Sequence, residues 1–210
     1  MLVDVEMVAL LDSPHQIGLD LGVTSLVVLS NGEKIANPKS FQKKRRKLRK
    51  AQKALSRKLH GSKNRHKARL KVAKVHAEIS DARKDFLHKL TTWLVRDNQT
   101  IAVEDLAVKK MVKNRKLALS ISDASWGEWV RQLEYKCDWY GRTLIKIDRW
   151  FPSSKRCGEC GHIVEKLPLN IREWDCPKCG THHDRDVNAA LNILAAGLAV
   201  KVRESERKTG

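Results

Sequence analysis

Short apolar runs separated by turn residues predict several strands in the first part of the chain. Residues 17–23 and 25–29 are rich in Leu, Ile and Val, which favour the pleated surface of a sheet. An Asn-Gly pair at 31–32 is a hairpin turn signal between the second run and a short run at 34–36. The pattern therefore predicts a β-hairpin start.

Apolar positions at three- and four-residue spacing predict two helices after these strands. One apolar stripe is formed by Leu48, Ala51, Leu55 and Leu59. A second stripe, at heptad-like intervals, is formed by Ile79, Ala82, Phe86, Leu90 and Trp93. Gly61 and Ser62 lie between the stripes, where Gly ends one helix and Ser caps the next. We expect an antiparallel helical hairpin over residues 43–97, basic near its turn and apolar toward its base.

The second half of the chain alternates between strand and helix patterns. Apolar runs at 100–106 and 143–147 predict strands, and between them lie a basic, poorly periodic loop at about 109–122 and a helix that Gly141 closes. The apolar face of that helix is formed by Trp126, Trp129, Leu133, Cys137 and Tyr140. An alanine-rich helix is predicted over 186–199, and the last ten residues are expected to fray. This order of elements predicts an α/β fold with a mixed sheet.

Positive charge is concentrated in one segment. The chain has 210 residues, with 42 Lys and Arg against 24 Asp and Glu and a formal net charge of +18. Residues 43–74 hold 16 of those bases and no acid, so the rest has 26 bases against 24 acids and is nearly neutral. A solvated helix face usually carries both signs, whereas a block of one sign repels itself without counterions. The segment therefore indicates a polyanionic partner, with nucleic acid as the first candidate.

Length and composition exclude several classes of protein. A hydrophobic fraction of 41% furnishes a core, so a globally disordered chain is excluded. No apolar run is long enough for a spanning helix, and the N-terminus lacks the basic-then-apolar pattern of a secretory signal. Four of the five cysteines form two Cys-x-x-Cys pairs, which is typical of a metal site in a reducing compartment. We therefore expect a cytosolic nucleic-acid protein without a membrane partner.

The two cysteine pairs form the most specific motif in the chain. Cys157 and Cys160 are separated by 15 residues from Cys176 and Cys179, and a glycine follows each pair directly. Four thiolates on two such knuckles suit one tetrahedral zinc ion at a closed structural site. A closed site leaves no position for water, so this zinc would fold a ribbon at about 153–183 and would not be a catalyst.

Other cysteine and histidine residues receive simpler interpretations. Cys137 lies on the apolar face of a predicted helix and is expected to be a buried, inert thiol. His182 and His183 are left out of the zinc site because four thiolates already saturate the ion. A disulfide framework does not fit the expected compartment, and a redox Cys-x-x-Cys would not need a second copy.

Three carboxylates stand on otherwise apolar elements. Asp20 is centred in a buried strand pattern, Glu104 closes a second one, and Asp186 opens the last predicted helix. Each alone has an ordinary explanation, such as hydrogen bonding to the backbone or capping a helix. Together they can converge at one sheet edge, where oxygen ligands bind a pair of Mg²⁺ or Mn²⁺ ions that cleave a phosphodiester. The pattern does not separate Glu104 from Asp105 or Asp186 from Asp184.

Several motifs together resemble one known family. Three segments are similar to the split motifs of a RuvC-type, RNase H-like nuclease: Ile17-Gly-Leu-Asp-Leu-Gly-Val23, Val103-Glu-Asp-Leu106 and Asp184-Arg-Asp-Val-Asn-Ala-Ala-Leu-Asn-Ile193. With a zinc ribbon between the second and third motifs, the chain resembles the TnpB (OrfB) proteins of insertion sequences, which are labelled transposases and are related to compact type V CRISPR effectors. The stretches 126–135 and 150–161 are also similar to the family's helix before the ribbon and to the start of the ribbon. The resemblance covers about residues 17–200.

The resemblance implies an RNA-guided, metal-dependent DNA endonuclease whose partners are DNA and a guide RNA in a prokaryotic cytoplasm, associated with the nucleoid when bound to DNA. It implies Asp20, Glu104 and Asp186 as the catalytic residues and ligands of two Mg²⁺ or Mn²⁺ ions, and residues 109–122 as a lid near them. The basic hairpin would line the channel for the guide–target heteroduplex. The expected contact residues are Lys43, Lys44, Arg45, Arg46, Lys47, Arg49, Lys50, Lys53, Arg57, Lys58, Lys63, Arg65, Lys67 and Arg69.

The resemblance also predicts a division into domains. Family members carry a β-barrel and a helical recognition lobe before the nuclease, so we expect an N-terminally truncated member here. The alternation of residues 2–11 then predicts the last strand of the barrel. The expected parts are this strand within 1–11, a nuclease core at 12–152, the zinc ribbon at 153–183, the last nuclease motif with its helix at 184–200, and a tail at 201–210.

Two other functions compete with the nuclease. One is a catalytically incompetent truncated copy that only binds DNA or RNA through the hairpin and the ribbon. The other is a strand-transferring transposase, which is disfavoured because no His-hydrophobic-His motif with a partner tyrosine is present and because Tyr135 and Tyr140 lie on an ordinary helix. Cleavage in the presence of Mg²⁺ or Mn²⁺ separates the nuclease from a protein that only binds.

Overall fold

A five-stranded mixed sheet forms the centre of the computed structural model, which describes residues 8–115 and 117–209. Its strands are β1 (Gln16–Leu21), β2 (Ser25–Leu29), β3 (Lys34–Ala36), β4 (Thr100–Glu104) and β5 (Thr143–Ile147). They are arranged in the order β3-β2-β1-β4-β5. β1 is antiparallel to β2 and parallel to β4, and β4 is parallel to β5. The predicted α/β class with a mixed sheet is confirmed.

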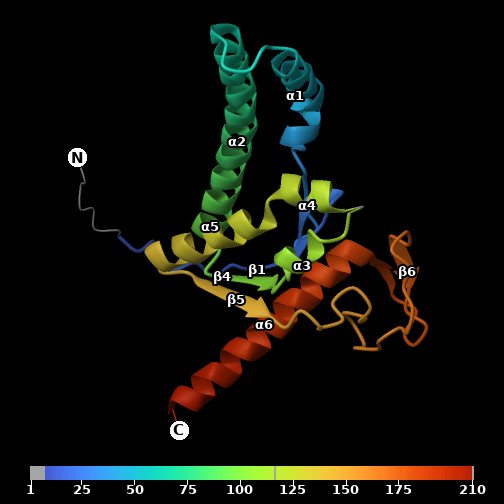
Figure 1. Cartoon of the computed structure of the whole chain (residues 1–210). Coiled ribbons are helices and arrows are strands. Elements are labelled where there is room, and N and C mark those ends of the chain that lie inside the picture. The colour runs from blue at the N-terminus through green and yellow to red at the C-terminus, as the bar shows by residue number, and fades with distance from the viewer. Residues whose placement is uncertain (1–7, 116, 210) are drawn as a thin grey trace.

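Helices cover both faces of this sheet (Figure 1). Successive strand residues point to opposite faces, so Leu19 and Val103 belong to the core beneath the helices of one side, and Ala102 packs with Ile193 on the other. Continuous apolar strands therefore form where both faces are buried. The helices of the body are α2 (Lys63–Asp97), α4 (Ala118–Ala124) and α5 (Trp126–Trp139) on one side and α6 (Arg185–Thr209) on the other.

The C-terminal helix α6 lies directly on the sheet because glycine allows a close approach. A Cβ atom added at Gly18 of β1 would lie 2.1 Å from the carbonyl oxygen of Ala190 and 2.8 Å from the Cβ of Leu194. Gly197 makes a similar approach to Ala102 of β4. This contact fixes the first turn of α6 at the edge where the parallel strands β1 and β4 both end.

The helical hairpin projects from the body as α1 (Ser40–Ser56) and the first half of α2 (Figure 1). Gly61 takes the left-handed conformation with φ 77°, and the Ser62 hydroxyl caps α2 by accepting from the Arg65 N–H. A small apolar cluster of Leu48, Val75 and Ile79 joins the two helices. The predicted hairpin and the Ser62 cap are therefore present. The prediction that Gly61 ends the first helix is wrong, because α1 already ends at Ser56 with Arg57 as its C-cap and Gly61 lies in the turn.

The register of the two predicted apolar stripes is partly wrong. Leu59 lies beyond the end of α1 and is 80% exposed, and Ala82 and Trp93 of α2 also face solvent. Leu87 and Leu94 are buried in the main core instead. Positions seven residues apart rotate gradually around a straight helix of 3.6 residues per turn. A predicted stripe with heptad spacing therefore moves off the buried face of a long helix.

The basic stretch at 109–122 is not a plain loop. It contains most of α3 (Val108–Met111) and the first part of α4, which runs on to Ala124. Ile121 and Ala124 are buried in the main core. These two positions anchor α4, whereas α3 has no buried residue, so neither short helix produces a helical period in the sequence.

Residues 8–11 of the strand predicted at 2–11 do not form a strand. Residues 2–7 lie outside the described residues, and residues 8–15 have no regular secondary structure. The side chain of Leu11 is 92% exposed, although the Arg142 guanidinium donates to its carbonyl oxygen at 2.9 Å. A strand prediction for residues 8–11 is wrong because their apolar side chains have no sheet face to cover.

The C-terminal end is helical where a frayed tail was predicted. Helix α6 continues through Thr209, so residues 201–209 belong to it. This stretch is rich in Lys, Arg and Glu, which are good helix formers, and no Gly or Pro interrupts the helix after Gly197. High polarity here accompanies an exposed helix and not a loss of structure.

The cysteine-containing segment between β5 and α6 forms a separate small unit. It contains a two-stranded antiparallel sheet of β6 (Glu173–Asp175) and β7 (His182–Asp184), which leads directly into α6. No helix in the described ranges combines the length and the apolarity needed to cross a lipid bilayer.

Candidate active site and metal centre

The three predicted carboxylates line one cavity of about 400 Å³, which we call the carboxylate cavity. Asp20 lies near the end of β1, Glu104 is the last residue of β4, and Asp186 lies in the first turn of α6. Because β1 and β4 are parallel neighbours, their ends meet at one edge of the sheet, where α6 also begins. Residues 20, 104 and 186 are therefore brought together by topology.

Burial and two neighbouring carboxylates raise the proton affinity of Asp20. Burial, followed by the charges of Glu104 and Asp186, raises the pKa of Asp20 to about 8, and the nearby guanidinium groups of Arg185 and Arg172 only partly offset this. Burial also raises the pKa of Glu104, while the hydrogen bond from the Ser153 hydroxyl opposes that rise. A bound cation would relieve this repulsion, since it favours the charged form of each carboxylate.

A cation from the protein itself holds one of these carboxylates. Arg172, in the loop before β6, donates to both oxygens of Asp186 at 3.3 and 3.4 Å. Arg185 is buried beside it and donates to the carbonyl oxygens of Pro168 and Ile171. The cysteine-containing unit therefore contributes an arginine to the carboxylate cavity. No spacing or periodicity marks Arg172, so sequence reasoning missed it.

Asp184 and Asp186 have different surroundings. One carboxylate oxygen of Asp184 caps α6 by accepting from the backbone N–H groups of Asp186 and Val187 at 3.1 and 3.0 Å, and the other pairs with the Lys34 ammonium at 2.5 Å. Burial raises the pKa of Asp184, but these hydrogen bonds outweigh it and keep the pKa below its ordinary value. Asp186 lines the carboxylate cavity and Asp184 does not.

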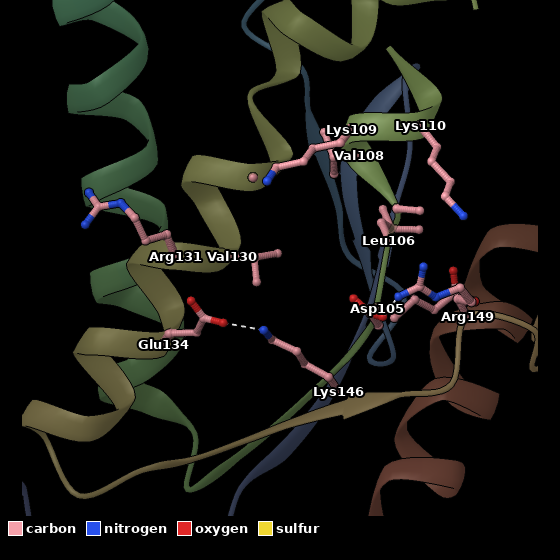
Figure 2. Close-up of a pocket in the computed structure, with 13 residues that line it drawn as sticks. Asp105, Leu106, Val108, Lys109, Lys110, Val130, Arg131, Glu134, Lys146 and Arg149 are labelled. Atoms are coloured by element: carbon pink, nitrogen blue, oxygen red, sulfur yellow. Dashed lines mark hydrogen bonds and ion pairs between the residues drawn. The ribbon is translucent and has the colours of Figure 1, made fainter. Parts of the chain in front are cut away.

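Asp105 also differs from its neighbour Glu104. It pairs with Arg149 and lines a second cavity of about 700 Å³ between α3 and α5, which we call the α5 cavity (Figure 2). Glu104 lines both cavities. The two alternatives that the sequence pattern left open therefore occupy distinct environments, and only Glu104 reaches the carboxylate cavity.

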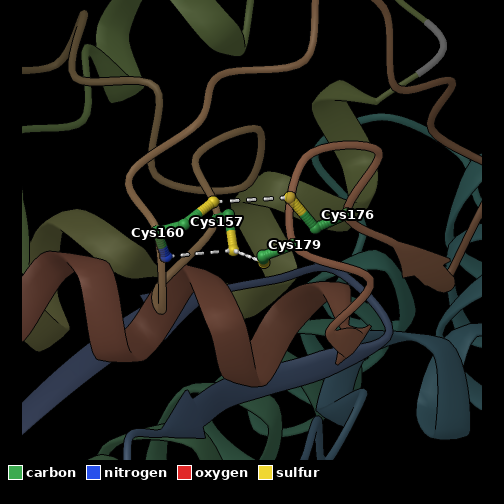
Figure 3. A group of neighbouring side chains, drawn as sticks. All are labelled: Cys157, Cys160, Cys176 and Cys179. Atoms are coloured by element: carbon green, nitrogen blue, oxygen red, sulfur yellow. Dashed lines mark hydrogen bonds between the residues drawn. The ribbon is translucent and has the colours of Figure 1, made fainter.

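The four predicted zinc ligands form a compact cluster (Figure 3). Their sulfur atoms all lie within 4.8 Å of one another, with 3.6 Å between Cys157 and Cys179 and 3.6 Å between Cys160 and Cys176. Thiolates around one tetrahedral zinc at about 2.3 Å would lie about 3.8 Å apart. The donor set and its geometry therefore fit one zinc ion.

Backbone geometry and one histidine support this cluster. Gly161 and Gly180 take the left-handed conformation, with φ 73° and 74°, and their N–H groups donate to the carbonyl oxygens of Cys157 and Cys176. These turns form the two knuckles. His183 is buried, and its Nε2 lies 3.1 Å from the Cys157 sulfur. His183 is thus a neighbour of the cluster, outside the four-thiolate set.

Among the described residues, the cysteines are the one group of three or more candidate ligands gathered so closely. The carboxylates share a cavity but are held further apart, with Asp186 paired to Arg172 and Glu104 bonded to Ser153.

Most predicted nucleic-acid contacts are exposed on α1, α2 and the turn between them. Four of the predicted set have side-chain contacts within the hairpin, among them Arg69, whose guanidinium lies 3.4 Å from Nδ1 of His66. Lys44 and Lys47 pair with Glu78 at 2.8 Å, and Arg65 donates to the carbonyl oxygens of Leu55 and Lys58. The remaining bases form the part of the hairpin that is available to a polyanion.

A buried carboxylate joins the hairpin to the body. Asp123 of α4 accepts from the backbone N–H groups of Phe41 and Gln42 at the start of α1, and from the Arg83 guanidinium at 3.0 Å. Its side chain is only 2% exposed. Arg83 and Phe41 lie 40 and 82 positions from Asp123 along the sequence, so no local pattern revealed the contact.

Two family descriptions match consecutive parts of the chain. The OrfB_IS605 description, probable transposase, matches residues 3–115, and the Cas12f1-like TNB domain matches residues 126–193. A solved complex of Cas12f1 with guide RNA and target DNA has a similar fold, with a TM-score of 0.61 at 20% identity over 88% of this chain and 51% of that chain.

Similar proteins of greater length are found in bacteria. A "Putative RNA-guided DNA endonuclease" of Streptomyces pristinaespiralis is 64% identical over 87% of this chain and 45% of its own length. A protein of the same description from Escherichia coli K12, InsQ, is 37% identical over 90% of this chain and 50% of its own length. The chain thus spans about half the length of the curated relatives that it matches.

Proposed function

The chain belongs to the OrfB_IS605 family of probable transposases, and from this premise we propose that it is the nuclease-bearing part of an RNA-guided DNA endonuclease. Its mixed sheet would then be an RNase H-like (RuvC) core. The names of the bacterial relatives support this activity. The observation that carries the proposal is the convergence of Asp20, Glu104 and Asp186 on one cavity.

The catalytic step would be hydrolysis of a DNA phosphodiester. Asp20, Glu104 and Asp186 would hold two Mg²⁺ or Mn²⁺ ions, which supply an activated water and stabilise the leaving oxygen. The raised pKa of Asp20 supports this role, since a buried carboxylate among like charges gains most from a cation. Ser153 would orient Glu104 through its hydroxyl hydrogen bond.

Arg172 would take part once the ions are present. If Asp186 binds the metal ions, the guanidinium of Arg172 would be released from the Asp186 carboxylate. It would then face the DNA phosphate in the same cavity. The zinc ribbon, proposed at 153–183, would then act on the reaction by holding this arginine. Zinc bound to Cys157, Cys160, Cys176 and Cys179 would be structural only.

The basic hairpin at 43–97 would bind the backbone of the nucleic acid. Its exposed Lys and Arg side chains fit a guide–target heteroduplex held through phosphates without base readout. The anchor at Asp123 would keep the hairpin in a fixed place relative to the nuclease core at 12–152. The segment 184–200 would supply the third catalytic motif.

A cleavage assay with a matched control tests this function. Purified protein with Mn²⁺ or Mg²⁺, with and without copurified RNA, is expected to cut plasmid or single-stranded DNA, and Asp20→Asn is expected to abolish cutting. Asp184→Asn is the control, because asparagine still caps α6 through its side-chain oxygen and Asp184 lies outside the cavity. Cutting that survives Asp20→Asn would refute the catalytic assignment, and salt-sensitive binding without any cutting would favour the binding-only alternative.

A further inference from the structure

The α5 cavity is not explained by the catalytic carboxylates. It lies between the segment after β4 and the first turns of α5, and its volume of about 700 Å³ is large beside the 400 Å³ carboxylate cavity. Sites that bind small organic groups have volumes of roughly 300–1,000 Å³. The α5 cavity therefore has room for a group as large as a nucleotide.

The walls of the α5 cavity are apolar on opposite sides. Figure 2 shows Leu106 and Val108 on one side and Val130 of α5 on the other. Gly127 lines the same cavity, and a Cβ atom added there would meet nothing within 4 Å. Two facing apolar walls with open space between them suit a flat ring whose faces are apolar, such as a nucleobase.

The rim of the cavity is basic after its internal ion pairs are taken into account. Asp105 is neutralised by Arg149, and Glu134 by Lys146, as Figure 2 shows for the second pair. The ammonium groups of the exposed Lys109 and Lys110 have no ion-pair partner within the part of the chain that the structure describes. The rim is therefore suited to the phosphates that flank a base.

Glu104 connects this cavity to the carboxylate cavity, because it lines both. We propose that the α5 cavity binds one base of a single-stranded DNA whose neighbouring phosphate lies over the carboxylate cavity. A base must leave its stack to insert between apolar walls, so the pocket selects a single strand over a duplex. This inference rests on the proposed nuclease function and adds a binding site for the substrate strand beside its catalytic groups.

Filling the cavity tests the proposal directly. Gly127→Leu places a side chain in the open space without a backbone clash, and Gly127→Ala is the matched control at the same helical position. The probes are a fluorescein-labelled oligothymidylate and a fully abasic strand of the same length, whose phosphate charge is equal. Binding is measured by fluorescence anisotropy without added divalent metal, so that no strand is cut.

We expect the wild type and Gly127→Ala to bind the oligothymidylate about tenfold more tightly than the abasic strand, and Gly127→Leu to lose most of that preference. Unchanged affinity for the abasic strand, together with an unchanged circular dichroism spectrum, shows that the variant is folded. An equal preference for bases in Gly127→Leu and Gly127→Ala would overturn the proposal. This experiment measures binding alone, so it is independent of the Asp20→Asn cleavage test. The base-binding proposal can therefore fail while the nuclease proposal holds, and the reverse.

Discussion

The cysteine cluster and the carboxylate cavity are both candidate metal sites, but they are assembled in different ways. The four cysteines lie within a segment of 23 residues, and their sulfur atoms are within 4.8 Å of one another. The three carboxylates come from positions 20, 104 and 186, and a sheet edge and a helix bring them to one cavity. The first site depends on local spacing, whereas the second depends on long-range packing.

The difference lies in what holds each site together without a metal. The cysteine unit has only a small apolar cluster around Trp174, so a bound zinc ion would supply much of its stability. The carboxylates stand on a well-packed core, which tolerates their repulsion and the raised pKa of Asp20. A structural metal site thus contributes to the stability of the fold. A catalytic site instead lowers stability through the repulsion between its carboxylates, and the surrounding core must compensate for that loss.

Removing a cysteine ligand should have the largest effect. Cys176→Ser is expected to release zinc and unfold the ribbon, because structural zinc in small units contributes about 10 kcal/mol or more of binding free energy. Zinc content by atomic absorption and protease sensitivity between residues 157 and 183 are the measurements. Cys137→Ser is the control, since this buried cysteine lies far along the chain from the cluster. A ribbon that keeps its zinc and its protease resistance in Cys176→Ser would contradict the assignment.

Crowding the contact between β1 and α6 should disturb the carboxylate site next most strongly. Gly18→Ala places a methyl group 2.1 Å from the Ala190 carbonyl oxygen, so α6 must shift, at a cost of about 1–3 kcal/mol. Urea denaturation should show this loss, and zinc content should remain that of the wild type. Gly127→Ala is the control, because it adds a methyl group in open space. Gly32→Ala would not serve, because Gly32 has φ 91°, a backbone conformation that strains alanine.

The pH dependence of stability should distinguish the two sites. Since the pKa of Asp20 is raised to about 8, the folded state holds a proton that the unfolded state has lost between about pH 4 and pH 8. The free energy of unfolding should therefore fall across this window as pH rises, by about 5 kcal/mol relative to Asp20→Asn. Chemical denaturation of both proteins at several pH values measures it, and parallel curves would show that Asp20 titrates normally.

Removing the arginine of the ribbon should have the smallest effect. Arg172→Ala takes a cation from the carboxylate cavity but leaves the zinc ligands intact. Cleavage should fall about tenfold, while zinc content stays unchanged, since one charge-assisted contact to a phosphate contributes about 1.5 kcal/mol. Arg203→Ala, which removes an exposed arginine of α6 that lines neither cavity, serves as the control. Equal rates for the two variants would show that Arg172 has only a structural role.

The same contrast explains how far the sequence could predict the sites. The cysteine cluster follows from spacing alone, because its ligands are neighbours in the chain. Asp20 and Glu104 were recognisable as charges on apolar strands, and the strand pattern also gave the mixed sheet. The choice of Asp186 for the cavity depends on a helix cap at Asp184 that no residue pattern displays. Spacing therefore predicts the ligands of a site whose residues are close in the sequence. For a site whose residues are far apart in the sequence, it gives only candidates.

Other features depend on contacts between distant segments and could not be predicted. Arg172 reaches Asp186, and Asp123 reaches the start of α1, only after the chain has folded. The short helices within 109–124 were missed because two buried positions are too few for a period. The sequence predicts a frayed tail at the polar end of α6, because a helix without an apolar face has no hydrophobic period. Such a segment looks like a disordered one in the sequence, although its residues favour a helix.

Direct measurement of Mn²⁺ binding tests the central claim, that Asp20, Glu104 and Asp186 form one cation site. Electron paramagnetic resonance of free Mn²⁺ gives the number of bound ions and their affinity in zinc-loaded protein. The wild type and Asp184→Asn are expected to bind about two ions per chain, and Asp20→Asn and Asp186→Asn are expected to lose most of this binding while keeping their zinc. Equal Mn²⁺ binding by Asp20→Asn and the wild type would contradict the account.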